Sequence, residues 1–163
     1  MSFTAHCNVI FNKAIEDYHV IDNVDTPINN PYDRDEIDNR LYLKCWIDTV
    51  QWHLEDIIRD PHIDPIEALA LKRRIDRSNQ DRTDLVEQID SYFRQKYSDV
   101  KPKDDARLNT ESPAWAIDRL SILALKITAS AARTSWPSCW SNRRTWALPS
   151  TSCWRTLRLE GST

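Results

Sequence analysis

The chain has 163 residues, a formal net charge of −3 and a single glycine, Gly161. That length suits one domain. The near-absence of glycine argues against a strand-rich fold and favours helices joined by Pro, Asp and Asn turns. The sequence has no run of about 18 apolar residues, so we expect no membrane span. The N-terminus lacks the basic segment and long apolar stretch of a signal peptide. We therefore expect a cytoplasmic location, in which the four cysteines are reduced.

The charge is unevenly distributed along the chain. Residues 1–127 carry 17 basic and 24 acidic residues, whereas residues 128–163 carry five Arg and one Glu. An acidic body repels phosphate backbones and anionic surfaces, so we expect no nucleic-acid partner.

Two helices are predicted in the first third of the chain. Apolar residues recur at spacings of three and four over residues 3–19, which predicts a helix. Residues 20–33 hold two Pro and several Asn and Asp, so they are expected to form a loop. A second helix, capped by Asp33 or Asp35, is predicted to run to about Arg59, where the prolines of DPHIDP interrupt it.

Two further helices complete the prediction. A third helix is expected from about Pro65, which suits the first turn, to about Lys96. Ser112 followed by Pro113 predicts the start of a fourth helix, which continues to Ile127. Four helices joined by short turns imply an all-α, antiparallel helical bundle. The inward face of the third helix is expected to carry Ile66, Leu69, Ile75, Leu85, Val86, Ile89, Tyr92 and Phe93.

The composition changes abruptly after Ile127. The segment 128–163 has no Lys, Asp, Ile, Val, Phe or Tyr, but it holds four of the seven Trp and two of the four Cys. The codons of Trp (TGG) and Cys (TGT or TGC) all begin with TG. In the reading frame that starts one base earlier, each of these positions becomes an NTG codon, which encodes Leu, Val or Met. Those positions then fit one helix face. We hypothesise an out-of-frame tail, disordered or loosely helical, after a bundle domain of residues 1–127; the alternative is a natural Trp- and Cys-rich tail.

A missing partner helix would leave one face of the fourth helix uncovered. That face carries Trp115, Leu120, Leu123 and Ile127. Exposed apolar patches of this kind promote association, so we expect the chain to be prone to aggregation.

Three segments of the body resemble a known family. These are QWHLEDIIRDP, LKRRIDRSNQDRTDLVEQID and TESPAWAIDRLSILALKI. On these segments the chain resembles the bacterial domain of unknown function 4254 family over roughly residues 3–127. The family continues as further helical sequence where this chain departs at Thr128, which supports the out-of-frame hypothesis. The resemblance implies a helical fold and a context near cell-envelope glycan enzymes, and it implies no particular activity.

Charged segments of the predicted helices supply the candidate ligand-binding residues. Polar residues between positions 73 and 80 share one face of the third helix, which suits either an anion or sugar-phosphate site or a solvated, salt-bridged surface. Asp118 and Arg119 interrupt an apolar helix, where charges are costly unless paired. We interpret them as an ion pair with the third helix or as the lining of a binding site. The candidate set is Trp52, Glu55, Asp76, Arg77, Asn79, Arg82, Asp118 and Arg119.

The sequence predicts no metal site and no cofactor. Helical bundles that hold two metal ions use Glu-x-x-His twice together with two further Glu, and here only Glu16 and His19 form such a pair. His53 lies on a different predicted helix and is interpreted, like His19, as a surface or partly buried polar residue. Cys139 and Cys153 have no ligand pair at zinc spacing.

Two functions remain open at this level. The first is a non-catalytic scaffold or interaction module with a protein partner, because no catalytic motif is recognisable and charged helical faces are abundant. The second is a ligand-binding or enzymatic bundle that acts on a small anionic or sugar-phosphate molecule. The second requires the candidate residues to converge on one cavity, whereas scattering over the surface would remove its basis.

Overall fold

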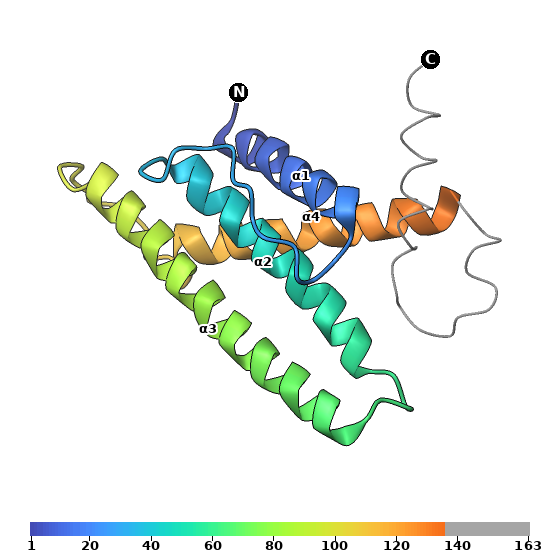
Figure 1. The fold of residues 1–163 in the computed structure, drawn as a ribbon. Coiled ribbons are helices and arrows are strands. Elements are labelled where there is room, and N and C mark those ends of the chain that lie inside the picture. Colours follow the sequence, from blue (N-terminus) through green and yellow to red (C-terminus); the bar gives the residue numbers. More distant parts are fainter. Residues whose placement is uncertain (136–163) are drawn as a thin grey trace, which may run out of the picture.

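The computed structural model shows a bundle of four helices and describes residues 1–135 (Figure 1). The helices are α1 (Phe3–Ile21), α2 (Ile37–Ile58), α3 (Pro65–Lys96) and α4 (Pro113–Ser135). No strand occurs among the described residues, which confirms the predicted all-α class.

Side-chain capping hydrogen bonds mark the starts of three of the four described helices. The hydroxyl of Ser2 accepts a hydrogen bond from the Ala5 amide at the start of α1. Asp64 accepts from two amides at the start of α3, directly before Pro65. Ser112 accepts from the Trp115 amide, as expected of the residue that caps α4. The prediction for α2 was wrong in detail, because its cap residue is Glu36, which makes no side-chain capping bond.

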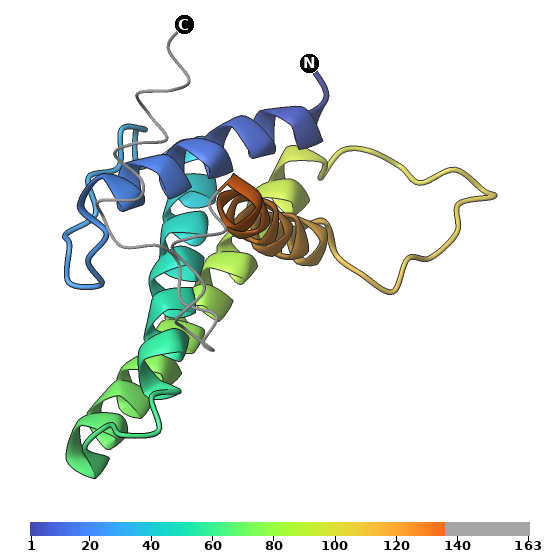
Figure 2. The ribbon, with the colours of Figure 1, turned by 90° about the vertical axis from the view of Figure 1, so that its right-hand side faces the viewer.

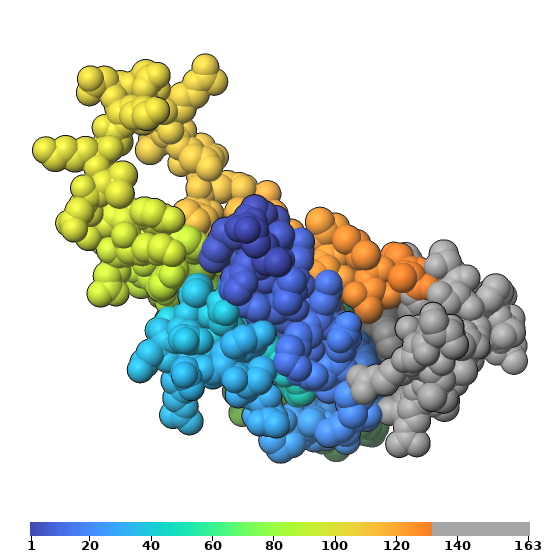
Figure 3. Space-filling model, turned by 90° about the horizontal axis from the view of Figure 1, so that it is seen from above, coloured from blue at the N-terminus to red at the C-terminus, as the bar shows by residue number. Residues whose placement is uncertain are grey.

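Helices α2 and α3 form a long antiparallel pair, and α1 and α4 lie across one half of it (Figures 1 and 2). Viewed from above, α1 lies between the start of α2 and the exposed end of α4, and the connection of residues 97–112 projects away from the helices (Figure 3). All four helices contribute to the core. Its buried members are Cys7, Ile10, Phe11, Ala14, Ile15, Tyr18, Leu41, Tyr42, Cys45, Trp46, Val86, Ile89, Ala114, Ile117, Ala124 and Leu125.

The far end of the α2–α3 pair extends beyond α1 and α4 (Figure 2). Ile66 and Leu69 were predicted to face inward, and the structure instead leaves them 80% and 52% exposed. The spacing of apolar residues identifies the correct face of α3, but it does not reveal where along the helix the covering helices stop. Ile75, Leu85, Val86 and Ile89 are buried as predicted.

Helix α4 continues past Ile127 to Ser135, so residues 128–135 are helical. The rest of the hypothesised out-of-frame tail, residues 136–163, lies outside the described residues. Within the described part of the chain, no helix is long and apolar enough to cross a membrane.

One face of α4 carries large apolar side chains that none of the other described helices, α1 to α3, covers. Trp115 and Leu123 are each 50% exposed and Ile127 is 60% exposed. Leu120, which was expected to belong to this face, is partly buried and packs against the core instead. The exposed row therefore consists of Trp115, Leu123 and Ile127.

We predict that this exposed row drives self-association. Replacing both Leu123 and Ile127 with Lys should reduce concentration-dependent association measured by sedimentation velocity, because charged side chains disfavour burial of the row in a contact. Val9→Lys, at an isolated exposed position on α1, is the matched control and should leave association unchanged. A wild-type chain that stays monomeric at every concentration tested would contradict the prediction.

Candidate functional site

Four charged side chains from three helices meet inside the bundle, and we call them the charged cluster. Lys44 and Asp48 lie one turn apart on α2, Arg82 lies on α3 and Asp118 lies on α4. Lys44 has no exposed surface, and Asp48 and Asp118 are 3% and 5% exposed. The hydroxyl of Ser121, one turn after Asp118 on α4, is also buried and joins the cluster.

The bonds within the charged cluster form a closed network. Lys44 Nζ contacts Asp48 Oδ2 and lies 2.9 Å from Asp118 Oδ1. Arg82 donates from Nε to Asp118 Oδ1 and from Nη2 to Asp118 Oδ2, both at 3.0 Å. Ser121 Oγ donates to Asp48 Oδ2 at 2.6 Å. The predicted ion pair between Asp118 and the third helix is therefore confirmed, with Arg82 as the partner.

The environment shifts the pKa values of Asp48 and Asp118 in opposite directions. Burial raises the pKa of Asp48, although Lys44, Ser121 and Arg82 oppose the rise. Burial also acts to raise the pKa of Asp118, but hydrogen bonds from Arg82 and the charge of Lys44 outweigh it, and the pKa is lowered. Asp118 is thus the carboxylate that its partners satisfy well, whereas Asp48 retains unmet bonding capacity.

A cavity of about 170 Å³ opens beside Asp48, between α2, α3 and α4. Asp48 Oδ1 lies 3.2 Å from Arg82 Nε, but the single Nε proton is directed to Asp118, so Oδ1 has no hydrogen-bond partner. Trp52 Nε1 is likewise buried without a partner among the described residues. The residues that line the cavity are Asp48, Gln51, Trp52, Glu55, Arg59, Arg82 and Ile122.

Five of the eight candidate residues lie at or next to this cavity. Trp52, Glu55 and Arg82 line it. Asp118 holds Arg82 in place. Asn79 accepts a hydrogen bond from the lining residue Gln51 at 2.8 Å.

The other three candidates lie elsewhere on the surface. Asp76 is exposed and pairs with Lys72 one turn earlier on α3. Arg77 is exposed. Arg119 is exposed and pairs with Glu111, which precedes α4. The placement of Asp76 and Arg77 matches the solvated, salt-bridged surface that was the alternative interpretation of residues 73–80. The predicted pairing of Arg119 with the third helix was wrong, because its partner is Glu111.

Sequence reasoning missed Lys44, Asp48, Gln51, Arg59 and Ser121. A signal for the first two was available, because Lys44 and Asp48 have the spacing of an ion pair and stand among Leu41, Cys45 and Trp46 on an inward face. The pairing of Asp118 with both Lys44 and Arg82 depends on how three helices pack, which spacing within one helix does not define.

Among the described residues, one group has the ligand types and proximity to hold a metal ion. It consists of His19, Asp22 and His53, whose donor atoms lie within 4.8 Å of one another. This group joins the end of α1 to α2 and shares no residue with the cavity lining.

The fold and the site define a small all-α protein with a cavity lined by charged, amide and apolar side chains beside a buried ionic network. A family model described as "Protein of unknown function (DUF4254)" matches residues 38–145. The chain belongs to that family. The match covers α2, α3 and α4, which supply every residue of the charged cluster, and it extends past Ile127, where the resemblance was expected to end. Comparison with curated proteins and with solved structures found no match.

We predict that removing the buried lysine charge destabilises the protein strongly. Lys44→Met leaves Asp48 and Asp118 without their shared cation, and breaking a buried ion pair from one side costs about 3–5 kcal/mol. Urea denaturation measures the change in the free energy of unfolding.

Lys72→Met is a matched control, because Lys72 and Asp76 have the same spacing on the same kind of element but are each 57% exposed. Exposed pairs contribute less than about 1 kcal/mol. Equal losses in the two variants would show that the charged cluster has no special role in stability.

Proposed function

We propose that the chain binds a small sugar phosphate in the cavity between α2, α3 and α4. The observation that carries this proposal is that two buried polar atoms on residues lining one cavity, Asp48 Oδ1 and Trp52 Nε1, have no hydrogen-bond partner among the described residues. An unsatisfied buried polar atom costs about 1–3 kcal/mol. A ligand that offers a donor to the carboxylate and an acceptor to the indole would offset both costs.

The lining matches the groups of a sugar phosphate. Hydroxyl groups both donate and accept, so they can bond to Asp48 and Glu55 as well as to the amide of Gln51. Arg59 and Arg82 offer guanidinium groups to a phosphate, which Arg binds in a planar, two-point geometry.

The size and the apolar lining limit the ligand further. The cavity is smaller than the roughly 300 Å³ at which pockets begin to enclose drug-sized molecules, so a single small ring is favoured. Trp52 and Ile122 supply apolar surface against the carbon-bearing face of such a ring. The proposal concerns binding, and it agrees with the sequence-based expectation of a link to envelope glycan metabolism.

A scaffold or interaction module is the second candidate function. The exposed row of Trp115, Leu123 and Ile127 supports it, because contiguous exposed apolar surface favours contact with another protein. Different residues form the cavity and the exposed row, so the two functions can be tested separately.

The sugar-phosphate proposal predicts saturable binding of a hexose phosphate in isothermal titration calorimetry. Trp52→Phe and Glu55→Gln should each weaken binding about 10-fold, because the first removes a hydrogen-bond donor and the second removes the charge from an acceptor, and a bond to a charged group contributes about 1.5–3 kcal/mol. Trp115→Phe and Glu87→Gln, at exposed positions, are the matched controls and should bind as the wild type does.

Comparison ligands separate the two halves of the proposal. Inorganic phosphate and the unphosphorylated hexose should each bind more weakly than the hexose phosphate. Equal binding of the hexose and the hexose phosphate would show that Arg59 and Arg82 do not bind the phosphate. Absence of binding by all three ligands would refute the proposal.

A further inference from the structure

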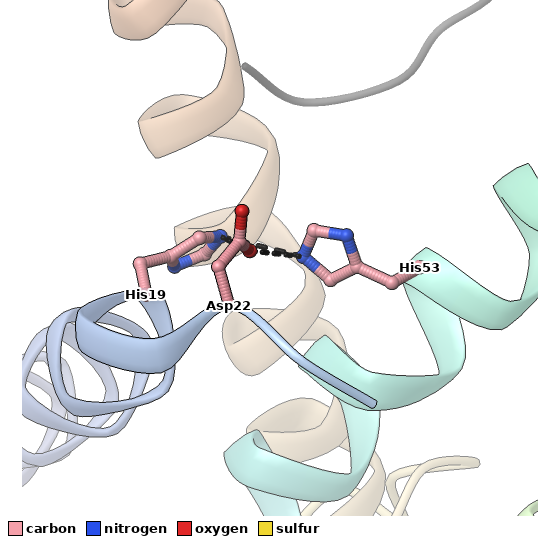
Figure 4. A group of neighbouring side chains, drawn as sticks. All are labelled: His19, Asp22 and His53. Carbon is pink, nitrogen blue, oxygen red and sulfur yellow. Dashed lines mark hydrogen bonds and ion pairs between the residues drawn. The ribbon is translucent and has the colours of Figure 1, made fainter. Parts of the chain in front are cut away.

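His19, near the end of α1, lies beside His53 of α2, and the carboxylate of Asp22 is directed at both rings (Figure 4). The two Nε2 atoms are 3.3 Å apart. Asp22 Oδ1 lies 3.9 Å from Nε2 of His19 and 3.8 Å from Nε2 of His53. Three donor atoms, from α1, from the residue that follows it and from α2, therefore surround one point.

Hydrogen bonding does not account for the position of the carboxylate. Distances of 3.8 and 3.9 Å are too long for hydrogen bonds to the rings. Asp22 Oδ1 is buried and accepts no hydrogen bond from any residue that the structure describes. A buried carboxylate oxygen that faces two imidazoles at these distances has the geometry of a metal ligand.

The spacing of the three atoms suits a transition-metal ion. Zinc binds histidine nitrogen at about 2.0–2.1 Å and carboxylate oxygen at about 2.0–2.2 Å, so two ligands of one ion can be at most about 4.2 Å apart. All three separations, 3.3, 3.8 and 3.9 Å, fall within this limit.

The surrounding structure already holds His19 in the form that binds a metal. Its Nδ1 lies 2.7 Å from the carbonyl oxygen of Ile15, which accepts a hydrogen bond, so Nδ1 carries the proton and Nε2 presents its lone pair. A backbone carbonyl that accepts from the second ring nitrogen is the usual support of a metal-binding histidine. Tyr18 stacks on His53, with ring centroids 5.0 Å apart, and limits the rotation of that ring.

The backbone brings Asp22 back over the histidines. Asp22 has φ 56° and ψ 48°, in the left-handed region, where it ends α1 and its amide donates to the Tyr18 carbonyl. Asp tolerates this region better than most non-glycine residues do. The left-handed conformation of Asp22 therefore places its carboxylate close to His19, three residues earlier in the chain.

We propose that His19, Asp22 and His53 bind one divalent transition-metal ion of the zinc class. Two imidazoles with one carboxylate favour such ions, whereas Mg²⁺ and Ca²⁺ prefer oxygen ligands alone. Three protein ligands leave a position open for a water or another molecule.

This proposal does not depend on the sugar-phosphate proposal, because it uses other residues and another ligand. It predicts that the full-length protein, freed of metal with a chelator, binds one equivalent of Zn²⁺ in isothermal titration calorimetry and melts at a higher temperature when Zn²⁺ is added. Mg²⁺ and Ca²⁺ at the same concentration should leave the melting temperature unchanged.

Three variants test the assignment of the ligands. Asp22→Asn keeps the shape of the side chain but removes its charge, and it should weaken Zn²⁺ binding at least 10-fold. His53→Ala should weaken it at least as much, and the far-ultraviolet circular dichroism of the metal-free variant shows whether it is folded. His62→Ala changes an exposed histidine in the α2–α3 connection and should bind Zn²⁺ as the wild type does.

Co²⁺ provides a second readout that does not depend on stability. Visible absorption typical of nitrogen and oxygen ligands supports the proposal, whereas an intense thiolate-to-Co²⁺ band would place the ion on cysteine and overturn it. Unchanged binding in Asp22→Asn and His53→Ala, or no stoichiometric binding by the wild type, would also overturn it.

Discussion

The burial of a single lysine constrains how three of the four helices pack. Lys44 has no exposed surface, and its ammonium group reaches Asp48 on its own helix and Asp118 on α4. A buried ammonium without such partners would cost several kcal/mol. Helix α4 must therefore place Asp118 over Lys44, and Arg82 of α3 then binds the other side of Asp118. A shift of α4 by one turn would break these contacts together, so the charged cluster defines the register of α2, α3 and α4.

The same contacts determine the shape of the cavity. Arg82 is held by two hydrogen bonds to Asp118, and Asp48 is held by Lys44 and Ser121, so two walls of the cavity have fixed positions before any ligand arrives. Such preorganisation lowers the entropy lost when a ligand binds. The entropy cost of ordering these side chains is met during folding, which would favour binding of the proposed ligand in so small a cavity.

The sequence predicted the helices well and the sites only in part. Apolar periodicity and the residues Asp64, Pro65 and Ser112 depend on local physics, so the starts of α3 and α4 were predicted correctly. The exposure of Ile66 and Leu69 depends on the lengths of helices packed against α3, which no local pattern records. Likewise, Lys44 and His53 acquire their partners only when α2 meets α4 and α1. A pair such as Lys44 and Asp48 on an apolar face is nevertheless a local signal that a buried partner of opposite charge must come from another helix.

A need for fixed register explains most of the charged cluster but not all of it. Hydrophobic side chains of similar volume often stabilise a core as much as a buried ion pair does, so buried charges are retained for specificity or for function. A device that only sets register works best when every buried polar atom is satisfied. Lys44, Asp118 and Ser121 meet that condition through their contacts with one another and with Asp48 and Arg82. Asp48 Oδ1 and Trp52 Nε1 do not meet it, although both residues line the cavity. Register therefore leaves these two atoms unexplained, whereas the ligand that we propose for the cavity would bond to both.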